Sequence, residues 1–403
     1  MGDVYKRQGV NTVNGRNGIA MIYLDNGATT YPKPPQVRAA LSEAMTRFGA
    51  NPGRAGHNMA MQTAESVFHV RESAAELFHA PGPENVVFTL NCTEAVNFVL
   101  KGLLRPGDHA VVSCLEHNAV FRPLWSLAKL GISYTVARVF PGDDDRTVAS
   151  FASCMKPNTR LIACIHASNV WGIRLPAERL AQLAHERGAA FLLDAAQSAG
   201  IVPIDLRSLQ ADYLCCAGHK GLYGPMGTGM LIFSPGAELQ LNTLLEGGTG
   251  SASASPEQPM LLPDRFESGT GNTPGVIALG EGIRFVRQKG EAKILKYEMD
   301  LIRRLYHRLE EAPNIILYTA EPDDEHYVPV LSFNHVGMTS EETAAQLNRA
   351  GFAVRAGLHC APLAHQWAQT LETGAVRCVP SVFTRPEQLD SFARQLTLLK
   401  NHR

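Results

Sequence analysis

Short apolar runs alternate with helix-like stretches along the chain from about residue 84. The runs are rich in Val, Ile, Leu and Phe, and they lie at 85–90, 109–115, 132–139, 161–166, 190–193 and 212–216. Apolar runs of this length are typical of strands that are covered on both faces. Between two of these runs, the apolar residues of 176–187 fall on one helical face, and Gly188 follows as a stop signal. The pattern predicts an α/β domain with a mainly parallel sheet and helical crossovers.

The pattern changes after about residue 275. A long charged helix is expected at 291–311, and shorter strand-like runs follow at 328–333, 353–355 and 375–379. Two pairs of residues have the spacing of a helix capping box, namely Thr339 with Glu342 and Thr384 with Glu387. These signals predict a smaller α+β domain at the C-terminal end of the chain.

The two patterns define the expected organisation of the chain. We expect a large α/β domain over 46–274 and a small α+β domain over 275–403, with the segment 21–45 packing against the small domain. Residues 1–20 are polar and lack a hydrophobic period, so they are expected to be a disordered leader or a sequence artefact. The glycine- and serine-rich stretch 247–256 is expected to be a loop within the large domain.

Composition and charge limit the classes of ligand that the protein is expected to bind. The 403 residues are 45% hydrophobic and 19% charged, and a formal net charge of -1 gives no basis for binding nucleic acid or anionic lipid. No apolar run is as long as a membrane span and no secretory signal is recognisable, so we expect a cytoplasmic protein that acts on small molecules. The eight cysteines include no C-x-x-C pair, which argues against a metal site or a disulfide framework and leaves thiols available for chemistry.

Lys220 lies in the glycine-rich turn AGHKG, directly after the expected strand at 212–216 and before a further apolar run at 229–233. Strand ends form the ligand crevice of open α/β sheets, and a lysine amine that is desolvated there can act as a nucleophile and a base. A surface lysine in a turn would have the same local sequence. The choice between these two interpretations depends on other positions.

Asp194 ends the fully apolar strand at 190–193. An unpaired buried carboxylate is costly, so its side chain is expected either to cap the next helix or to meet a cation. A protonated pyridine nitrogen in a cofactor ring is such a cation, and its charge makes the ring an electron sink. The spacing between Asp194 and Lys220 fits two parallel strands joined by a crossover, which would place both residues at one edge of the sheet.

Two further residues follow expected strands and have weaker signals of their own. Thr93 opens an expected helix, where free backbone N–H groups and its hydroxyl could hold a phosphate, although an ordinary N-cap would look the same. His117 lies just beyond another strand, where its ring could stack on a planar cofactor, although most histidines at such turns have no such role.

Seven short motifs occur in one order along residues 21–403. They are DNGATT at 25–30, NCTEA at 91–95, EH at 116–117, HASNV at 166–170, DAAQ at 194–197, GHK at 218–220 and FESGT at 266–270. Each motif is weak alone, but together they resemble those of the class V aminotransferase and cysteine desulfurase family, and the chain is similar to cysteine desulfurases and selenocysteine lyases. The resemblance implies the fold of pyridoxal phosphate (PLP)-dependent transferases of fold type I, with a large mainly parallel-sheet domain and a smaller α+β domain.

The resemblance also implies PLP as the cofactor and indicates the residues that bind it. Lys220 would form the Schiff base, Asp194 would pair with the pyridine nitrogen, and His117 would stack on the ring. The remaining contacts would be made by Gln197 and Asn169 on the oxygen side of the ring and by Thr93, Cys92 and His219 at the phosphate. Thr270 would reach the phosphate of the neighbouring subunit's cofactor, so a homodimer is implied.

The segment RAGLHCAP at 355–362 resembles the loop whose cysteine accepts sulfur in desulfurases. One cysteine among eight is usually a buried structural residue, but Gly357 and Pro362 indicate a loop, in which the Cys360 thiol can be reached. Arg377 corresponds to the family's carboxylate-binding arginine, whose planar fork grips a carboxylate at two points; a surface salt bridge is the alternative. Arg355 is a candidate helper in substrate binding.

The resemblance therefore implies desulfuration of L-cysteine to L-alanine, with Lys220, His117 and Cys360 as catalytic residues. The sulfur would stay on Cys360 as a persulfide until a small thiol or an acceptor protein collects it. PLP chemistry alone leaves open an aminotransferase, a selenocysteine lyase, or another lyase or epimerase of the same fold. A catalytically silent sulfur-relay partner is the alternative that is not an enzyme.

Overall fold

The computed structural model describes residues 12–14, 20–53 and 56–399. Its contacts divide the chain into two compact units, each of which is discontinuous in sequence. Unit 1 comprises Met1–Pro32, Asn169–Gly172 and Lys293–Arg403, and unit 2 comprises Lys33–Ser168 and Ile173–Ala292. The two units are described separately below.

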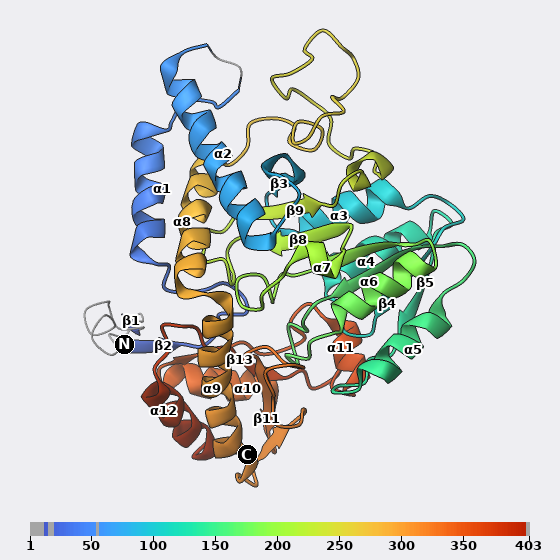
Figure 1. The fold of residues 1–403 in the computed structure, drawn as a ribbon. Helices are drawn as coiled ribbons and strands as arrows, with labels where there is room; N and C mark the ends of the chain where they lie inside the picture. Colours follow the sequence, from blue (N-terminus) through green and yellow to red (C-terminus); the bar gives the residue numbers. More distant parts are fainter. Residues whose placement is uncertain (1–11, 15–19, 54–55, 400–403) are drawn as a thin grey trace. The chain divides into compact units, whose positions relative to one another are not determined.

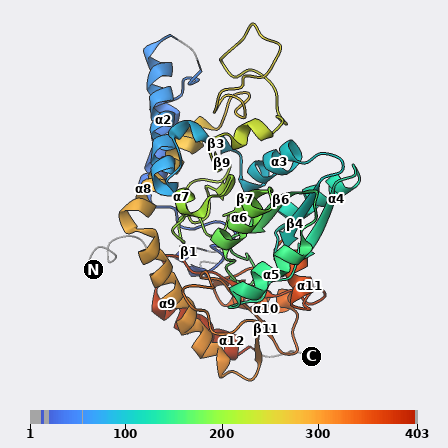
Figure 2. The ribbon, with the colours of Figure 1, turned by 45° about the vertical axis from the view of Figure 1, so that its right-hand side comes forward.

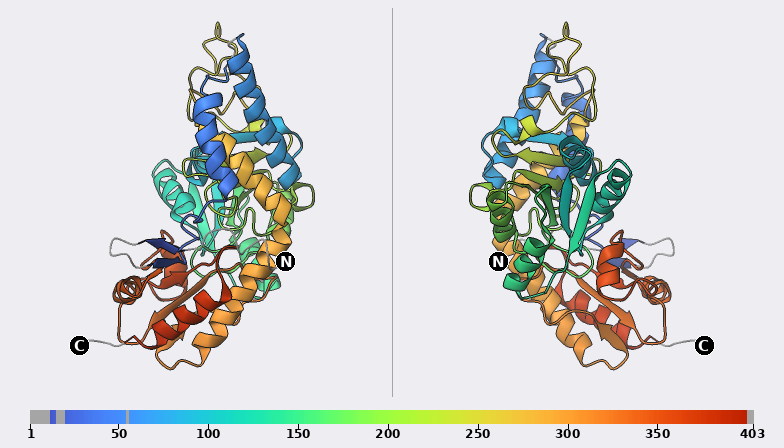
Figure 3. Two further views of the ribbon diagram at one scale, coloured as in Figure 1. Left: turned by 90° about the vertical axis from the view of Figure 1, so that its left-hand side faces the viewer. Right: turned by 90° about the vertical axis from the view of Figure 1, so that its right-hand side faces the viewer.

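The boundaries of the units differ from those expected from the sequence pattern. The helix α8 (Thr273–Lys289) packs against α1 (Pro35–Arg47) and α2 (Asn58–Phe78), and Figure 3 shows the three helices side by side. These contacts keep α8 in unit 2, so the change to unit 1 falls at Lys293 and not at residue 275. They also place α1 in unit 2, although the expected segment 21–45 would have grouped it with the small domain.

Unit 2 is built on a seven-stranded sheet (Figure 1). Its strands, in spatial order, are β3 (Val86–Thr89), β9 (Gly229–Phe233), β8 (Tyr213–Ala217), β7 (Ala190–Asp194), β6 (Thr159–Ile165), β4 (His109–Ser113) and β5 (Ser133–Ala137). Only β9 runs antiparallel to its neighbours, so the other six strands of this sheet share one direction. The expected mainly parallel sheet is confirmed.

Helices cover both faces of this sheet, which explains the continuous apolar runs. Every position of β4, β7, β8 and β9 is buried. One face shares a core with α3 (Cys92–Leu103) and α4 (Asn118–Ala128). The other helices of unit 2 include α5 (Asp144–Cys154), α6 (Ala177–Glu186) and α7 (Leu206–Leu209), with short 3-10 helices η2 (Pro83–Asn85) and η3 (Ala237–Gln240) (Figure 2). Burial on both faces is the arrangement that such apolar strands require.

The described residues of unit 1 form two small sheets and four helices. One sheet pairs β2 (Ala20–Tyr23) with β1 and with β12 (Phe352–Ala353), and the other has the order β10 (Ile315–Leu317), β11 (Leu331–His335), β13 (Val376–Cys378). The helices are α9 (Glu291–Glu310), which begins at the end of unit 2, α10 (Ser340–Arg349), α11 (Pro362–Trp367) and α12 (Pro386–Thr397). Apolar side chains of α9, α12, β11 and β13 form a common core.

Two local expectations need correction. Residues 1–11 and 15–19 of the expected leader lie outside the described residues, but β1 (Thr12–Asn14) is a strand, because its backbone pairs antiparallel with β2. Thr339 and Glu342 form the expected capping box. Thr384 does not cap α12: the helix begins one residue later, because Pro386 occupies its first position, and Gln388 accepts from the backbone N–H of Arg385 at 2.8 Å.

Candidate active site

The carboxyl ends of the parallel strands meet at one edge of the sheet in unit 2. Because β3 and β8 both pair antiparallel with β9, they run in the same direction as β4, β6 and β7. The predicted residues that follow these strand ends are Thr93 after β3, His117 after β4, Asp194 and Gln197 at and after β7, and His219 and Lys220 after β8. The topology therefore brings side chains that follow four strands to one edge, the usual ligand position in such sheets.

Asp194 is buried at the end of β7, with 1% of its surface exposed. Its Oδ1 atom accepts a hydrogen bond from the backbone N–H of Ala196 at 2.9 Å and from the thiol of Cys92 at 3.3 Å. Burial and then the Asp194 charge raise the pKa of the Cys92 thiol well above its usual value, so the thiol stays protonated and donates. The side chain of Cys92, expected at a phosphate, is thus in contact with the carboxylate of Asp194.

The N-terminus of α3 is capped by Asn91 and not by Thr93. The side-chain oxygen of Asn91 accepts from the backbone N–H of Glu94 at 2.9 Å, while the carboxylate of Glu94 accepts from the N–H of Leu90 at 2.6 Å. Thr93 is the second helical residue, and it is exposed. The positive end of the helix dipole and the Thr93 hydroxyl therefore remain together at the start of α3.

His117 caps α4, and its neighbour Glu116 is fully buried behind the same strand end. Nδ1 of His117 accepts from the backbone N–H of Ala119 at 3.0 Å, which indicates the tautomer with its proton on Nε2. Oε1 of Glu116 accepts from the backbone N–H of Ile165 at 2.9 Å, and burial raises the pKa of Glu116 to about 8. Glu116 is therefore a neutral acid at pH 7, near the carboxylate of Asp194 at the end of β7.

The turn after β7 carries Gln197, which is buried. The hydroxyl of the adjacent Ser198 lies 2.9 Å from Nδ1 of His166, the residue that follows β6. Burial, followed by the charge of Arg174, lowers the pKa of His166 to about 3, so this ring is neutral at pH 7. Its hydrogen bond with Ser198 connects the end of β6 to the turn after β7. Gln197 is thereby held on a fixed turn of the sheet edge.

Lys220 lies in a turn that the surrounding backbone holds closely. A Cβ atom at Gly221 would lie 2.3 Å from the carbonyl oxygen of Ala199, so only glycine fits beside the lysine at this point. Burial, then the charges of Lys220 and Lys33, lower the pKa of His219 to about 4. His219 is therefore neutral at pH 7 and would offer a phosphate a hydrogen bond without a full charge.

Thr270 lies in the segment between η3 and α8, and its side chain is exposed. Its hydroxyl accepts a hydrogen bond from Nδ2 of Asn51 at 3.4 Å. Three residues earlier, Glu267 forms an ion pair with the buried Arg71 and accepts from the backbone N–H of Phe88 at 2.6 Å. These contacts anchor the start of the segment and leave Thr270 at the surface of unit 2.

In unit 1, Arg377 is buried on β13, with 3% of its side chain exposed. Nη2 of Arg377 pairs with the Asp25 carboxylate at 2.9 Å, and Nη1 donates to the carbonyl oxygen of Asn169 at 2.8 Å. The Asp25 carboxylate also contacts Nε of the half-exposed Arg355 at 3.1 Å. Burial lowers the pKa of Arg377, and Asp25 opposes that shift. Two cations thus share one anion, which leaves a net positive charge for an anionic ligand.

The loop that carries Cys360 is also in unit 1. His359 and Cys360 both have positive φ angles, 49° and 58°, a conformation that costs energy for residues other than glycine. The carbonyl of His359 accepts from Nδ2 of Asn169 at 2.7 Å, and its Nε2 donates to the carbonyl oxygen of Ala375 at 2.9 Å. These contacts offset the strain. All eight cysteines lie within the described residues, and Cys360 is the exposed one among them.

The sequence analysis missed several residues that orient the candidate site residues. Asp25 was noted only as part of a motif, although it pairs with both arginines. Glu116 was likewise noted only beside His117. Neither spacing nor composition could have revealed these roles, because the partners come from distant segments.

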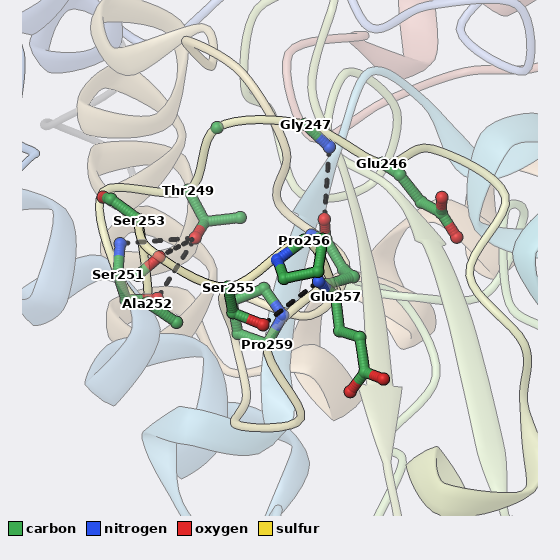
Figure 4. Close-up of a pocket in the computed structure, with 12 residues that line it drawn as sticks. Glu246, Gly247, Thr249, Ser251, Ala252, Ser253, Ser255, Pro256, Glu257 and Pro259 are labelled. Carbon is green, nitrogen blue, oxygen red and sulfur yellow. Dashed lines mark hydrogen bonds between the residues drawn. The ribbon is translucent and has the colours of Figure 1, made fainter.

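A pocket of about 340 Å³ lies in the loop 246–259 of unit 2 (Figure 4). It is lined by residues of that loop alone, and none of the predicted site residues is among them. In the part of the chain that the structure describes, no group of three or more His, Cys, Asp or Glu residues could hold a metal ion. Within the same ranges, no helix is both long and apolar enough to cross a bilayer.

Comparison with known proteins gives one consistent family. The model of the family described as aminotransferase class-V matches residues 22–392. A probable cysteine desulfurase of Mycolicibacterium paratuberculosis is 35% identical over 87% of this chain, which spans 51% of that longer protein. A probable cysteine desulfurase of Methanothermobacter thermautotrophicus is 33% identical over 93% of this chain and 94% of its own length.

Solved structures of cysteine desulfurases also resemble this chain. The apo structure of a cysteine desulfurase from Thermococcus onnurineus NA1 superposes with a TM-score of 0.85 at 30% identity, covering 94% of each chain. The likeness thus extends over nearly the whole chain, including the segments that form both clusters of candidate site residues.

Proposed function

Because the chain belongs to the class V aminotransferase family, whose members depend on PLP, we propose that it is a cysteine desulfurase. Its fold, with the mainly parallel sheet, is fold type I of the PLP-dependent enzymes. One observation carries the choice of reaction: the Cys360 thiol is exposed on a strained loop, whereas the other seven cysteines are buried or half-buried. An incidental cysteine would not require such a loop.

The residues at the sheet edge of unit 2 fit PLP. Asp194 is a buried carboxylate whose recorded partners, an amide N–H and a thiol, are neutral donors, so it suits the protonated ring nitrogen. Thr93 at the start of α3 and the neutral His219 suit the phosphate. Lys220 would carry the cofactor as a Schiff base, His117 would stack on the ring, and the remaining ring contacts would come from Gln197 and Asn169.

When bound, PLP supplies an electron sink that stabilises negative charge at the substrate Cα. In this proposal, Arg377 binds the substrate carboxylate and Arg355 assists, because their shared pairing with Asp25 leaves one positive charge uncompensated. The Nζ atom of Lys220 takes up the Cα proton.

The Cys360 thiolate then attacks the sulfur atom of L-cysteine. A bond forms between the two sulfur atoms while the substrate Cβ–S bond breaks, so the sulfur stays on Cys360 as a persulfide. The carbon skeleton takes up one proton at Cβ, Nζ of Lys220 returns the other proton to Cα, and the product leaves as L-alanine. A small thiol or an acceptor protein then attacks the persulfide and regenerates the thiol. L-Selenocysteine could enter by the same route, because its Cβ–Se bond is softer.

The proposal includes a homodimer and a cytoplasmic setting. Thr270 is exposed on an anchored segment, which suits a contact with a neighbouring subunit's cofactor. All eight cysteines are free, which suits a reducing compartment. Light scattering of the purified protein tests the dimer, and a monomer would remove the role given to Thr270.

The reaction is tested by supplying L-cysteine and a thiol reductant to the PLP-loaded protein and measuring sulfide and alanine together. We expect the two products in equal amounts. A keto acid in place of alanine would instead indicate transamination. If Cys360→Ala released sulfide at the wild-type rate, the persulfide route would be wrong.

A further inference from the structure

Backbone hydrogen bonds close the turn that carries Lys220. The backbone N–H of Gly224 donates to the carbonyl oxygen of Gly218 at 2.8 Å, and the N–H of Tyr223 donates to the carbonyl oxygen of Lys220 at 2.8 Å. Between these two acceptors lies the carbonyl of His219. Its oxygen belongs to the peptide group that joins His219 to Lys220, so its orientation sets the direction in which Lys220 leaves the backbone.

The partner of that carbonyl is a lysine from a distant part of the chain. Nζ of Lys33 donates to the carbonyl oxygen of His219 at 2.7 Å, across 186 positions of sequence. Both residues belong to unit 2. The neighbouring carbonyls accept from backbone N–H groups of the same turn, whereas the His219 carbonyl accepts from the side chain of a distant lysine.

The backbone around Lys33 is rigid. Proline residues precede it at position 32 and follow it at positions 34 and 35, and Pro35 is the first residue of α1. The helix α1 in turn packs against α8. Lys33 therefore leaves the chain from a fixed point, so its amine is held against the turn with little loss of backbone freedom.

The position of this lysine is costly. The Lys33 side chain is half-buried, and burial lowers its pKa to about 7, because partial removal from water disfavours the charged amine. A surface lysine would avoid this cost by turning into solvent. The turn is also closely packed at Gly218, because a Cβ atom there would lie 2.3 Å from Oγ1 of Thr228.

We propose that Lys33 is a positioning residue for the cofactor-bearing Lys220, acting through the hydrogen bond from its Nζ to the carbonyl oxygen of His219. The inference rests on the part of the proposed function that places PLP on Lys220, and it does not depend on which reaction follows. Without this donor the peptide group before Lys220 loses a hydrogen bond that orients it, so the Lys220 amine is held less firmly toward the cofactor. Cofactor attachment then becomes slower and weaker.

The test uses the apoenzyme, prepared by removing PLP, and follows its visible absorbance as PLP is added back. Lys33→Met keeps the length of the side chain but removes the donor, and we expect its PLP dissociation constant to rise about tenfold with slower attachment. Lys33→Arg keeps a donor and should recover part of this loss. Lys129→Met, at an exposed lysine in the same unit, is the matched control and should bind PLP as the wild type does.

Thermal unfolding of the apoenzymes separates positioning from folding. Lys33→Met removes a costly buried amine, so its apoenzyme should unfold at a temperature no lower than that of the wild type. Wild-type PLP affinity and attachment rate in Lys33→Met would overturn the inference, and so would equal impairment of Lys33→Met and Lys33→Arg. A wild-type protein that binds PLP on Lys220 but forms no alanine from cysteine would contradict the proposed reaction alone.

Discussion

The two clusters of candidate site residues differ in how the chain holds them. In unit 2, Asp194 and Lys220 take their places from the ends of adjacent parallel strands, which the sheet itself aligns. In unit 1, Arg377 is oriented by Asp25 and by the carbonyl of Asn169, which come from segments far away in sequence. The first cluster is a product of topology, and the second is a product of individual side-chain contacts. Substitutions should therefore affect the two in different ways.

The largest effect is expected from Lys220→Ala in unit 2. The substitution removes the amine that we propose bears the cofactor and takes the Cα proton, so alanine formation from L-cysteine should fall by roughly 10⁴-fold. The visible absorbance of the bound cofactor should lose its sensitivity to borohydride. Circular dichroism should remain that of the wild type, because the turn is held by backbone contacts. A variant that kept borohydride-sensitive absorbance would show that another lysine carries PLP.

A smaller loss is expected from Cys360→Ser in unit 1. The hydroxyl is a far weaker nucleophile toward sulfur than a thiolate, so alanine formation should fall by about 10²-fold to 10³-fold. The cofactor absorbance should not change, because Cys360 is not among the residues proposed to contact the cofactor. Persulfide on the protein, measured by mass spectrometry after L-cysteine is added, should disappear.

The matched control is Cys154→Ser, because Cys154 is a half-buried thiol at the end of α5. It should keep both the wild-type rate and the persulfide on Cys360. If instead Cys154→Ser removed the persulfide, the sulfur acceptor would have been assigned to the wrong loop.

The contrast between the clusters also explains what could be predicted from sequence. The strands at 190–193 and 212–216 were recognisable because burial on both faces requires continuous apolar runs, and Asp194 and Lys220 follow from their ends. The resemblance of seven ordered motifs then supplied the cofactor and the expected roles. The predicted ends of the helices and strands lie within a few residues of the observed ends. The two kinds of element could be told apart because apolar residues recur with different periods in helices and in strands.

The contacts that orient these residues could not be predicted. Asp25 lies 352 positions from Arg377, and no local rule links a carboxylate near one end of a chain to a guanidinium near the other. The hydrogen bond from Cys92 to Asp194 was also unforeseen, because spacing indicates which strand ends meet and not which atoms point toward each other. The start of α12 was misplaced for a local reason, namely the preference of proline for the first helical position.

Asp25→Asn tests the second cluster directly. The substitution keeps the shape of the side chain but removes the charge that holds two guanidinium groups, so Arg377 should lose its fixed orientation. The KM for L-cysteine should rise about tenfold with a smaller change in kcat, because a charge-assisted hydrogen bond contributes about 1.5 to 3 kcal/mol. Steady-state kinetics on the PLP-loaded enzyme gives both values.

A surface pair in the same unit provides the control for Asp25→Asn. Asp390 contacts Arg304 at 2.6 Å, with 46% of the arginine side chain exposed, so Asp390→Asn should leave KM unchanged. A fall in KM for Asp25→Asn would mean that Asp25 competes with the substrate carboxylate for Arg377 and does not orient it.

The smallest effect concerns Glu116, the neutral acid at the sheet edge of unit 2. Burial raises its pKa from 4.5 to about 8, so between these values the folded protein holds a proton that the unfolded chain has lost. Folding stability from this group is therefore complete below about pH 4.5 and falls as pH rises toward 8. In Glu116→Gln this dependence is absent. Between pH 6 and pH 7, the wild type should lose about 1 kcal/mol of unfolding free energy relative to the variant. Urea unfolding at the two pH values measures the difference, and an equal response of both proteins would mean that Glu116 is already ionised at the sheet edge.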